Sequence, residues 1–382
     1  MEDKKYFSRQ IDESLMAWKN STRHKPLLLR GARQVGKSSS VRHLAKQFDN
    51  FVEINFERKP AYLEIFKGDR DAKHIVEMIK SITGEPIVPG KTLLFFDEIQ
   101  MCQEAISSLR FFWEDMPGLH VIAAGSLLEF ALSEIPTFGV GRIHSMFMYP
   151  MSFDEFLNAL GMFSLQKYKR EASPEKPLLS ALHEQLVSLF RTYLMVGGMP
   201  ESVSTWVDTH SYVECQAVQK EIAYTYEEKN TKYKKRANTT LLRQTLHSAA
   251  HQIGGKFVYS QVSRDFRSYQ IKEALSLLTL AGLLVPVCNT AANGFPLGAE
   301  ADENCVKYLF LDSGLLLAIL GMDFGNITSI SEDILIGNAA DLVNKGHITE
   351  MVAGLEIIKN QQPDNVLSLY FWMREARGAL AE

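Results

Sequence analysis

The sequence predicts an α/β domain over residues 1–160, in which helices flank a parallel sheet, followed by a mainly helical remainder. The first observation behind this prediction is that short apolar runs alternate with segments of helical periodicity, which is typical of parallel strands covered on both faces. The second is a glycine-rich turn directly after the first run, where a helix is expected to begin. The apolar runs are residues 26–29, 51–56, 91–99, 120–126 and 145–151.

Helices are expected between these runs and after them. Apolar residues recur at the helical spacing in residues 39–48, 71–82 and 102–116. After the last run, Ser152 and Glu155 form a capping-box pattern that predicts the start of another helix. A later helix is expected to stop at the glycine pair and proline of residues 197–200.

Composition limits the function classes. The chain has 382 residues and a net charge of −4, so no overall basic field attracts nucleic acid or an anionic membrane. Its four cysteines are scattered and form no zinc-ligand spacing, so we expect reduced thiols. The charged N-terminus has no apolar signal region, and no apolar stretch reaches the about 18 residues of a membrane span. We therefore predict a cytoplasmic protein without a membrane partner.

The glycine-rich turn reads RGARQVGKSS, and its residues Gly31, Gly36, Lys37 and Ser38 fit the phosphate-binding pattern G-x-x-x-x-G-K-[ST]. Glycines let backbone N–H groups turn toward phosphates, and the following helix adds the positive end of its dipole. Lys37 is expected to supply charge to the β- and γ-phosphate oxygens, and the Ser38 hydroxyl to bind magnesium.

The backbone of this loop is expected to make most of the nucleotide contacts. Arg33 and the Gln34 side chain therefore receive no catalytic role, and both side chains are expected to face away from the phosphates. The predicted nucleotide contacts are Gly31, Ala32, Gln34, Val35, Gly36, Lys37, Ser38 and Ser39.

A pair of carboxylates follows the third apolar run. Asp97 ends a strand-like run and, with Ser38, is expected to hold Mg²⁺, while Glu98 is placed to polarise the water that attacks the γ-phosphate. The alternative is that both carboxylates cap the helix of residues 102–116. Their combination with Lys37 favours ATP and Mg²⁺ as ligands.

Two further residues are candidates with open alternatives. Ser126 ends a run whose strand is expected between the strands that carry the loop and the carboxylates, where its hydroxyl can contact the γ-phosphate or the water. Its alternative role is the N-cap of a helix over residues 127–132. Arg142 follows a glycine-rich turn and can reach the γ-phosphate within its own subunit or from a neighbour. Its alternative is an exposed structural arginine.

These motifs resemble those of a bacterial and archaeal family of AAA-like ATPases that carry a C-terminal domain of unassigned function. The resemblance covers almost the whole chain. It implies nucleotide contacts at Gly31, Gly36, Lys37 and Ser38, a metal and water pair at Asp97 and Glu98, and a sensor at Ser126, but no chemistry for Gln100. The segments that carry it are GARQVGKS, EINFE, FFDEIQ, AAGSLLE, GRI, YPMSFDEFL, YLMVGGMPE and YLFLDSGLLLAILG.

The second half of the chain has the element order of a winged helix. The expected order is a helix (238–254), a short helix (260–266), a longer helix (268–283) and two strands (283–289 and 306–312). The longer helix offers only Lys272, beside Glu273, to read bases, so a protein-docking or subunit interface is at least as well supported as DNA.

A basic run lies upstream, at Lys229–Arg236, interleaved with tyrosines. It can bind nucleic acid through phosphates and stacked bases, or form a solvated linker helix, which Glu227 and Glu228 favour. Residues 346–360 and 366–382 resemble the start of a restriction-endonuclease-like fold with Glu350 on its first helix. The later acidic residues and lysine of such a site do not follow, so we expect a fragment or a degenerate domain that does not cut DNA.

We therefore predict a slow, Mg²⁺-dependent ATPase that acts as a nucleotide-driven switch for a protein partner. The alternatives are a DNA-associated ATPase and a nucleotide-binding interaction protein with negligible turnover. The protein can be a monomer or an oligomer. The predicted domains are the ATPase domain (1–160), a helical lid or linker (161–237), a winged helix (238–325) and a truncated nuclease-like segment (326–382).

Overall fold

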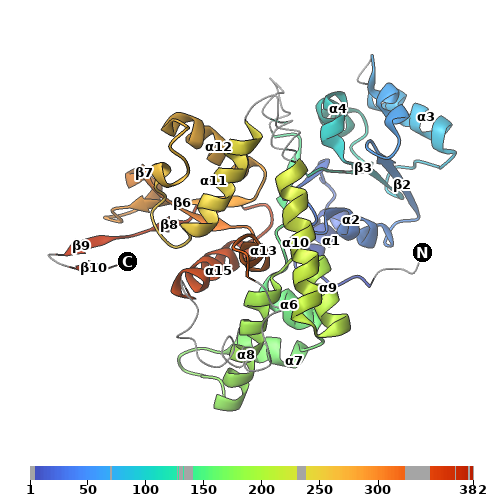
Figure 1. Ribbon diagram of the computed structural model, residues 1–382. Coiled ribbons are helices and arrows are strands. Elements are labelled where there is room, and N and C mark those ends of the chain that lie inside the picture. Colours follow the sequence, from blue (N-terminus) through green and yellow to red (C-terminus); the bar gives the residue numbers. More distant parts are fainter. Residues whose placement is uncertain are drawn as a thin grey trace. The chain divides into compact units, whose positions relative to one another are not determined.

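The computed structural model separates the chain into two compact units (Figure 1). The first unit comprises Met1–Tyr149 with Gln362–Val366, and the second comprises Pro150–Gln361 with Leu367–Glu382. The four domains expected from the sequence, and the three boundaries between them, stay predictions. The structure describes residues 5–68, 71–126, 128, 132, 141–229, 238–322, 345–365, 367–376 and 379–381.

A five-stranded parallel sheet forms the centre of the first unit, with the order β2-β3-β4-β1-β5. This confirms the expected parallel sheet and the place of β4 between β1 and β3. In register, Leu29 and Asp97 both lie opposite Ala124, so the carboxyl ends of three strands meet at one edge. The strands are β1 (Leu27–Arg30), β2 (Asn50–Asn55), β3 (Thr92–Asp97), β4 (His120–Ala124) and β5 (His144–Phe147).

Helices cover both faces of this sheet (Figure 1). On one face, aromatic side chains of the strands, of η1 and of α4 pack edge to face, with Phe96 against both Phe66 and Phe112. α1 and α2 pack together on the other face, where α2 contacts β3 and β4. These elements are α1 (Ile11–Asn20), α2 (Lys37–Ala45), η1 (Pro60–Phe66), α3 (Ala72–Thr83), η2 (Ile99–Met101) and α4 (Gln103–Asp115).

The second unit is mainly helical. The expected capping box is present at the start of α6, where the Ser152 hydroxyl accepts from the Glu155 N–H and the Glu155 carboxylate accepts from the Ser152 N–H. α8 ends before Gly197, as expected, and Pro200 begins the next helix. The helices are α6 (Phe153–Ala159), α7 (Phe163–Glu171), α8 (Ser180–Val196), α9 (Pro200–Thr209), α10 (Tyr212–Lys229), α11 (Thr239–His251), α12 (Ser268–Leu280), α13 (Ser313–Ile319) and α15 (Lys345–Lys359).

A small sheet follows α12. β6 (Leu284–Thr290) and β7 (Ala301–Phe310) pair antiparallel, and η5 (Leu297–Glu300) lies between them. The short helix expected over residues 260–266 is wrong, because a single 3₁₀ turn, η4 (Tyr259–Gln261), is formed there.

The last part of the chain contributes to the same small sheet. β8 (Tyr370–Phe371) pairs parallel with β6, and β9 (Arg374–Ala376) forms a hairpin with β10 (Ala379–Ala381). β8 therefore shares a sheet with β6 and β7, whereas β9 and β10 form a separate two-stranded sheet. None of the described helices has the length and apolar character needed to cross a membrane. All four cysteines are free thiols, as expected.

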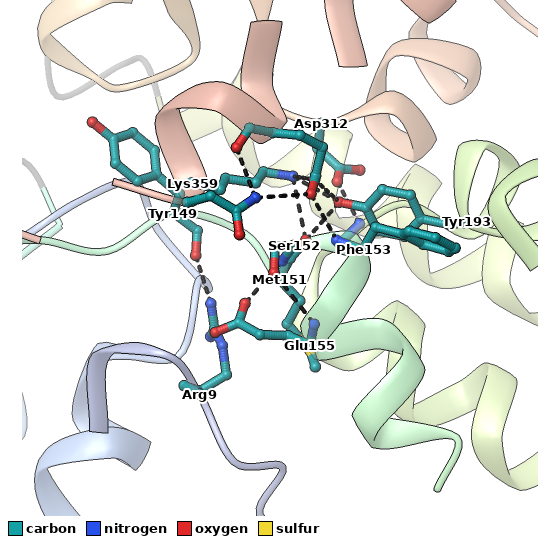
Figure 2. Close-up of polar contacts among 12 residues, drawn as sticks. Arg9, Tyr149, Met151, Ser152, Phe153, Glu155, Tyr193, Asp312 and Lys359 are labelled. Carbon is teal, nitrogen blue, oxygen red and sulfur yellow. Dashed lines mark hydrogen bonds and ion pairs between the residues drawn. The ribbon is translucent and has the colours of Figure 1, made fainter. Parts of the chain in front are cut away.

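A buried polar cluster in the second unit explains two of the sequence motifs (Figure 2). The Tyr193 hydroxyl lies 2.7 Å from the Met151 carbonyl and 2.9 Å from Glu356 Oε1, and it accepts from Lys359 Nζ at 2.8 Å. The Asp312 carboxylate accepts from the Gly198 N–H at 2.6 Å and caps α13 through the Leu315 N–H.

Close packing around Gly197 and Gly198 leaves no room for a side chain at either position. A Cβ at Gly198 would overlap the Met151 carbonyl, and a Cβ at Gly197 would overlap the Asp312 carboxylate. The GGMPE and LDSGL motifs therefore meet in one packed polar cluster. Burial raises the pKa of Asp312, while the positive charge of Lys359 lowers it.

Candidate nucleotide-binding site

The glycine-rich loop connects β1 to α2 at the carboxyl edge of the first sheet. Its backbone is left-handed at Gly36 and at Gln34, where φ is 101° and 60°. Gly31 has a φ of 138°, and a Cβ there would overlap the Met148 carbonyl. The loop is therefore closely packed, and the N–H groups of the first turn of α2 lie outside the helix's own hydrogen bonding. Backbone donors and a helix dipole at one place suit a phosphate group.

Lys37 is a buried cation inside this loop. Its ammonium group donates to the carbonyls of Gly31 at 2.8 Å and Ala32 at 2.6 Å, and only 8% of the residue is exposed. Burial lowers the pKa of Lys37 to about 8, against the opposing effect of the carboxylates Glu98 and Asp97. The group retains its charge at neutral pH and has two acidic residues nearby.

Asp97 joins the loop to the end of β3. Its Oδ1 accepts from the Ser38 hydroxyl at 2.9 Å, and its Oδ2 accepts from Asn55 Nδ2 at 2.9 Å. Arg42, which forms a two-pronged ion pair with Glu53, approaches Oδ2 to 3.7 Å. Burial raises the pKa of Asp97, and the hydrogen bond from Ser38 opposes this effect.

Asn55 and Arg42 were not predicted from the sequence. Strand register gives the signal for Asn55, because this residue ends β2 directly opposite Asp97. Arg42 lies on α2 one helical turn beyond Ser38, so its position on the same side of the helix is readable once the helix is assigned.

Glu98 lies in a left-handed turn at the end of β3, with φ 53° and ψ 42°. Such a conformation is uncommon for a residue other than glycine and occurs often at functional sites. Its carboxylate accepts from the Gln100 amide, and the buried Ser126 hydroxyl lies 3.5 Å from the same oxygen. Arg33 Nε donates to Ser126 Oγ at 3.1 Å. Arg33 thus contacts a residue beside Glu98, and the expectation that its side chain faces away from the phosphates stays a prediction.

Arg142 is half-exposed and forms an ion pair with Glu114 at the end of α4, with 2.6 Å between Nε and Oε1. In the first unit it therefore stands apart from the group formed by Lys37, Asp97 and Glu98. The helix that Ser126 was expected to cap lies almost wholly outside the described residues.

Arg9 is a further residue that the sequence did not indicate. It precedes α1 and is buried, and its guanidinium donates to the carbonyl of Val35 in the loop at 2.9 Å and to that of Tyr149 at 2.8 Å (Figure 2). Nothing in the charged N-terminal segment distinguishes this arginine from its neighbours, so no sequence signal identifies it.

The donor set fits magnesium together with a nucleotide. Among the described residues, no three histidine, cysteine or acidic side chains gather as a metal cage. Mg²⁺ rarely needs one, because it usually takes one or two carboxylates and completes its shell with phosphate and water oxygens. The Ser38 hydroxyl and the Asp97 carboxylate, 2.9 Å apart beside the loop, are oxygen donors of this kind.

Comparisons with known proteins agree with this geometry. Residues 23–157 match the family model described as AAA domain, and residues 187–325 match that described as Domain of unknown function (DUF8612). No curated protein matches the chain. The Walker-type ATPase PABY2304 of Pyrococcus abyssi has a similar structure, with a TM-score of 0.54 at 15% identity over 82% of this chain and 96% of its own.

Two more distant structures also align. The Orc1 protein of Aeropyrum pernix in complex with DNA has a TM-score of 0.32 at 10% identity, over 84% of this chain and 94% of its own. The Hsp104–ADP complex of Saccharomyces cerevisiae has a TM-score of 0.33 at 14% identity, over 72% and 38%. Neither likeness is close enough to inform fold or function. The chain therefore carries a region that matches an AAA domain, followed by a region that matches a domain of unknown function, and its fold is similar to that of the Pyrococcus Walker-type ATPase.

Proposed function

We propose that this protein binds ATP with Mg²⁺, hydrolyses it slowly and uses the cycle as a conformational switch for a protein partner. One observation carries the catalytic part. The Ser38 hydroxyl of the loop and the Asp97 carboxylate of β3 lie 2.9 Å apart, although 59 positions separate them in the sequence. Lys37 and Glu98 adjoin this pair, so charge, metal ligands and a candidate base occupy one edge of the sheet.

Each residue has a role that its position supports. Lys37 stabilises charge on the phosphate oxygens, and Ser38 and Asp97 hold the metal ion, which neutralises those oxygens when bound. Glu98 orients and activates the attacking water, and Ser126 contacts the γ-phosphate or that water. The loop contacts are the backbone groups of Gly31, Ala32, Gln34, Val35, Gly36, Lys37, Ser38 and Ser39.

Arg142 enters this proposal under one condition. To reach a phosphate, in its own subunit or in a neighbouring copy, it must release Glu114, with which it is paired at 2.6 Å. Exposed ion pairs of this kind stabilise a protein by at most about 1 kcal/mol, so breaking the pair with Glu114 costs little free energy.

We propose a protein partner, docked through a winged helix built from α11, α12, β6 and β7. The far end of the β6–β7 hairpin, residues 289–304, which includes the connection and the adjoining strand ends, contains three acidic residues and no lysine or arginine, which is unsuited to a phosphate backbone. Phe295 within it is 95% exposed, and aromatic side chains are enriched at protein interfaces. Lys272 of α12 lies over the Tyr259 ring at 5.9 Å.

Nucleic acid stays the second candidate partner. The basic run that would bind it, Lys229–Arg236, lies outside the described residues apart from the backbone of its first lysine. The nuclease-like character of residues 326–382 also stays a proposal, and the expectation that the chain does not cut DNA stays with it.

Steady-state ATP hydrolysis tests the proposal. The wild-type chain, Lys37→Ala, Glu98→Gln and the exposed control Gln47→Ala are compared with Mg²⁺ and with EDTA. We expect Mg²⁺-dependent turnover in the wild type and the control, binding without turnover in Glu98→Gln, and weakened binding in Lys37→Ala. Equal inactivity of wild type and Glu98→Gln, with nucleotide bound by both, would instead establish an interaction protein without turnover.

Adding duplex DNA at two salt concentrations separates the candidate partners. Stimulation that falls as salt rises supports the DNA-associated ATPase, because phosphate contacts are salt-dependent. No response to DNA at either concentration supports the protein partner.

A further inference from the structure

Gln100 contacts the candidate base through a specific bond. Gln100 lies two residues after Glu98, in η2, and its amide Nε2 donates to Glu98 Oε2. The turn itself is fixed by the backbone bonds from Met101 N to Glu98 O at 3.0 Å and from Cys102 N to Ile99 O at 2.9 Å. The donor therefore comes from a constrained piece of backbone.

A second donor reaches the same oxygen from another strand. The Ser126 hydroxyl, which follows β4, lies 3.5 Å from Glu98 Oε2 and accepts from Arg33 at 3.1 Å. Within the described part of the chain, Glu98 Oε1 accepts no side-chain hydrogen bond. The two oxygens of the Glu98 carboxylate thus differ among the described residues: Oε2 accepts from Gln100 and Ser126, whereas Oε1 accepts from no side chain.

Gly125 leaves the space that this arrangement needs. A Cβ at position 125 would overlap Gln100 Oε1 and would lie 3.2 Å from its Cδ. The backbone of Gly125 is not left-handed, so its conformation does not require glycine. Space for the Gln100 amide is the requirement that the structure does show, and it links the FFDEIQ and AAGSLLE segments.

We propose that Gln100 is a positioning residue that holds Oε2 of Glu98 so that Oε1 is presented to the attacking water, and that glycine at position 125 leaves room for the Gln100 amide. The inference rests on the proposed ATP hydrolysis. A carboxylate with free χ rotations spends much of its time misdirected, and misplacement by about 1 Å can cost about a hundredfold in rate. Ground-state nucleotide binding does not use Glu98, so the effect should fall on kcat alone.

The test combines two variants that remove the same contact in different ways. Gln100→Ala deletes the amide, whereas Gly125→Ala displaces it by occupying its space. The displaced atom is the far end of a flexible side chain, so folding should be nearly unaffected. Gly118→Ala is the matched control, because its Cβ would meet Pro89 at an ordinary 3.5 Å and its φ is not positive.

We expect kcat to fall between about tenfold and a hundredfold in each variant, with the dissociation constant for a non-hydrolysable ATP analogue changed less than about twofold. The double variant Gln100→Ala/Gly125→Ala should be no slower than Gln100→Ala, because the added methyl then has no amide to displace. Crystal structures of the free variants should show the Glu98 carboxylate in a changed rotamer.

Several results would overturn the inference. An unchanged or raised kcat in Gln100→Ala excludes a positioning role, and multiplied losses in the double variant exclude a shared cause. A loss confined to nucleotide affinity or thermal stability shows a structural role instead. These outcomes concern Gln100 alone when the wild type hydrolyses ATP, whereas a wild type without turnover refutes the proposed function and this inference with it.

Discussion

Acidification should destabilise the first unit through a stacked histidine pair at the amino end of β4. The rings of His24 and His120 stack at 3.7 Å, both residues are buried, and Trp18 contacts each ring edge-on. Burial lowers the pKa of His120 from 6.5 to about 4, and the neighbouring charges of His24 and Lys19 act in the same direction. The hydrogen bond between Nε2 and the Lys19 carbonyl, 2.9 Å long, opposes this.

The sign and size follow from proton linkage. Between pH 6.5 and pH 4 the unfolded chain binds a proton at His120 that the folded chain does not, so stability falls as pH falls through this window. With those two pKa values, the free energy of unfolding should decrease by about 2 kcal/mol between pH 7 and pH 4.5. The groups that face the ring are His24, Lys19 and the aromatic rings of Trp18 and Phe48.

Urea unfolding followed by tryptophan fluorescence measures this effect at several pH values. His120→Phe should lose the hydrogen bond at every pH but should flatten the pH dependence by about 2 kcal/mol relative to the wild type. His74→Ala, at an exposed site on α3, should keep the wild-type slope. Carboxylates also titrate in this range, and the difference between the two proteins cancels their contribution. Identical pH slopes for wild type and His120→Phe would refute the reasoning.

Three further predictions concern single residues. Because the pKa of Lys37 is lowered to about 8 and nucleotide binding needs its charge, the dissociation constant for ATP should rise about fivefold between pH 8 and pH 9, whereas Lys37→Arg should show no such rise when titrated calorimetrically. Tyr193→Phe should lower the free energy of unfolding by about 2 kcal/mol in thermal or urea melts, because it deprives the partly buried charges of Glu356 and Lys359 of a hydrogen-bond partner, while the exposed Tyr168→Phe should not. Gly31→Ala should abolish nucleotide binding in an equilibrium binding assay, because its Cβ would overlap the Met148 backbone carbonyl; retained binding would show that the loop tolerates a shift there.

The first sheet was predictable because its evidence is local. Each strand is a short apolar run, each helix has its own periodicity, and right-handed crossovers leave few ways to order parallel strands. The prediction failed at residues 260–266, where polar residues follow a short apolar stretch. Only a 3₁₀ turn is formed there, and none of its side chains is buried. The pairing of β8 with β6 was also missed, because a two-residue strand carries almost no pattern of its own.

Part of the candidate site could be proposed from the sequence for the same reason. Lys37, Ser38, Asp97 and Glu98 belong to short motifs whose spacing reflects the chemistry of phosphate and metal binding. Arg9 could not be found in this way, because its partners are two backbone carbonyls, one of them 140 positions away. A backbone acceptor leaves no trace in the identity of the partner residue.

A glycine can indicate a long-range contact that the neighbouring sequence does not reveal, because a Cβ at its position would overlap an atom from a distant segment. Gly31 and Gly197 have positive φ, so local geometry alone could account for them. Gly125 and Gly198 have no such backbone requirement, and each lies where a Cβ would overlap an atom from a distant segment. The two cases differ in what is overlapped, since Gly125 faces a movable side-chain amide and Gly198 faces the Met151 carbonyl. Space at Gly125 therefore serves the orientation of Glu98, whereas space at Gly198 serves the packing of the second unit.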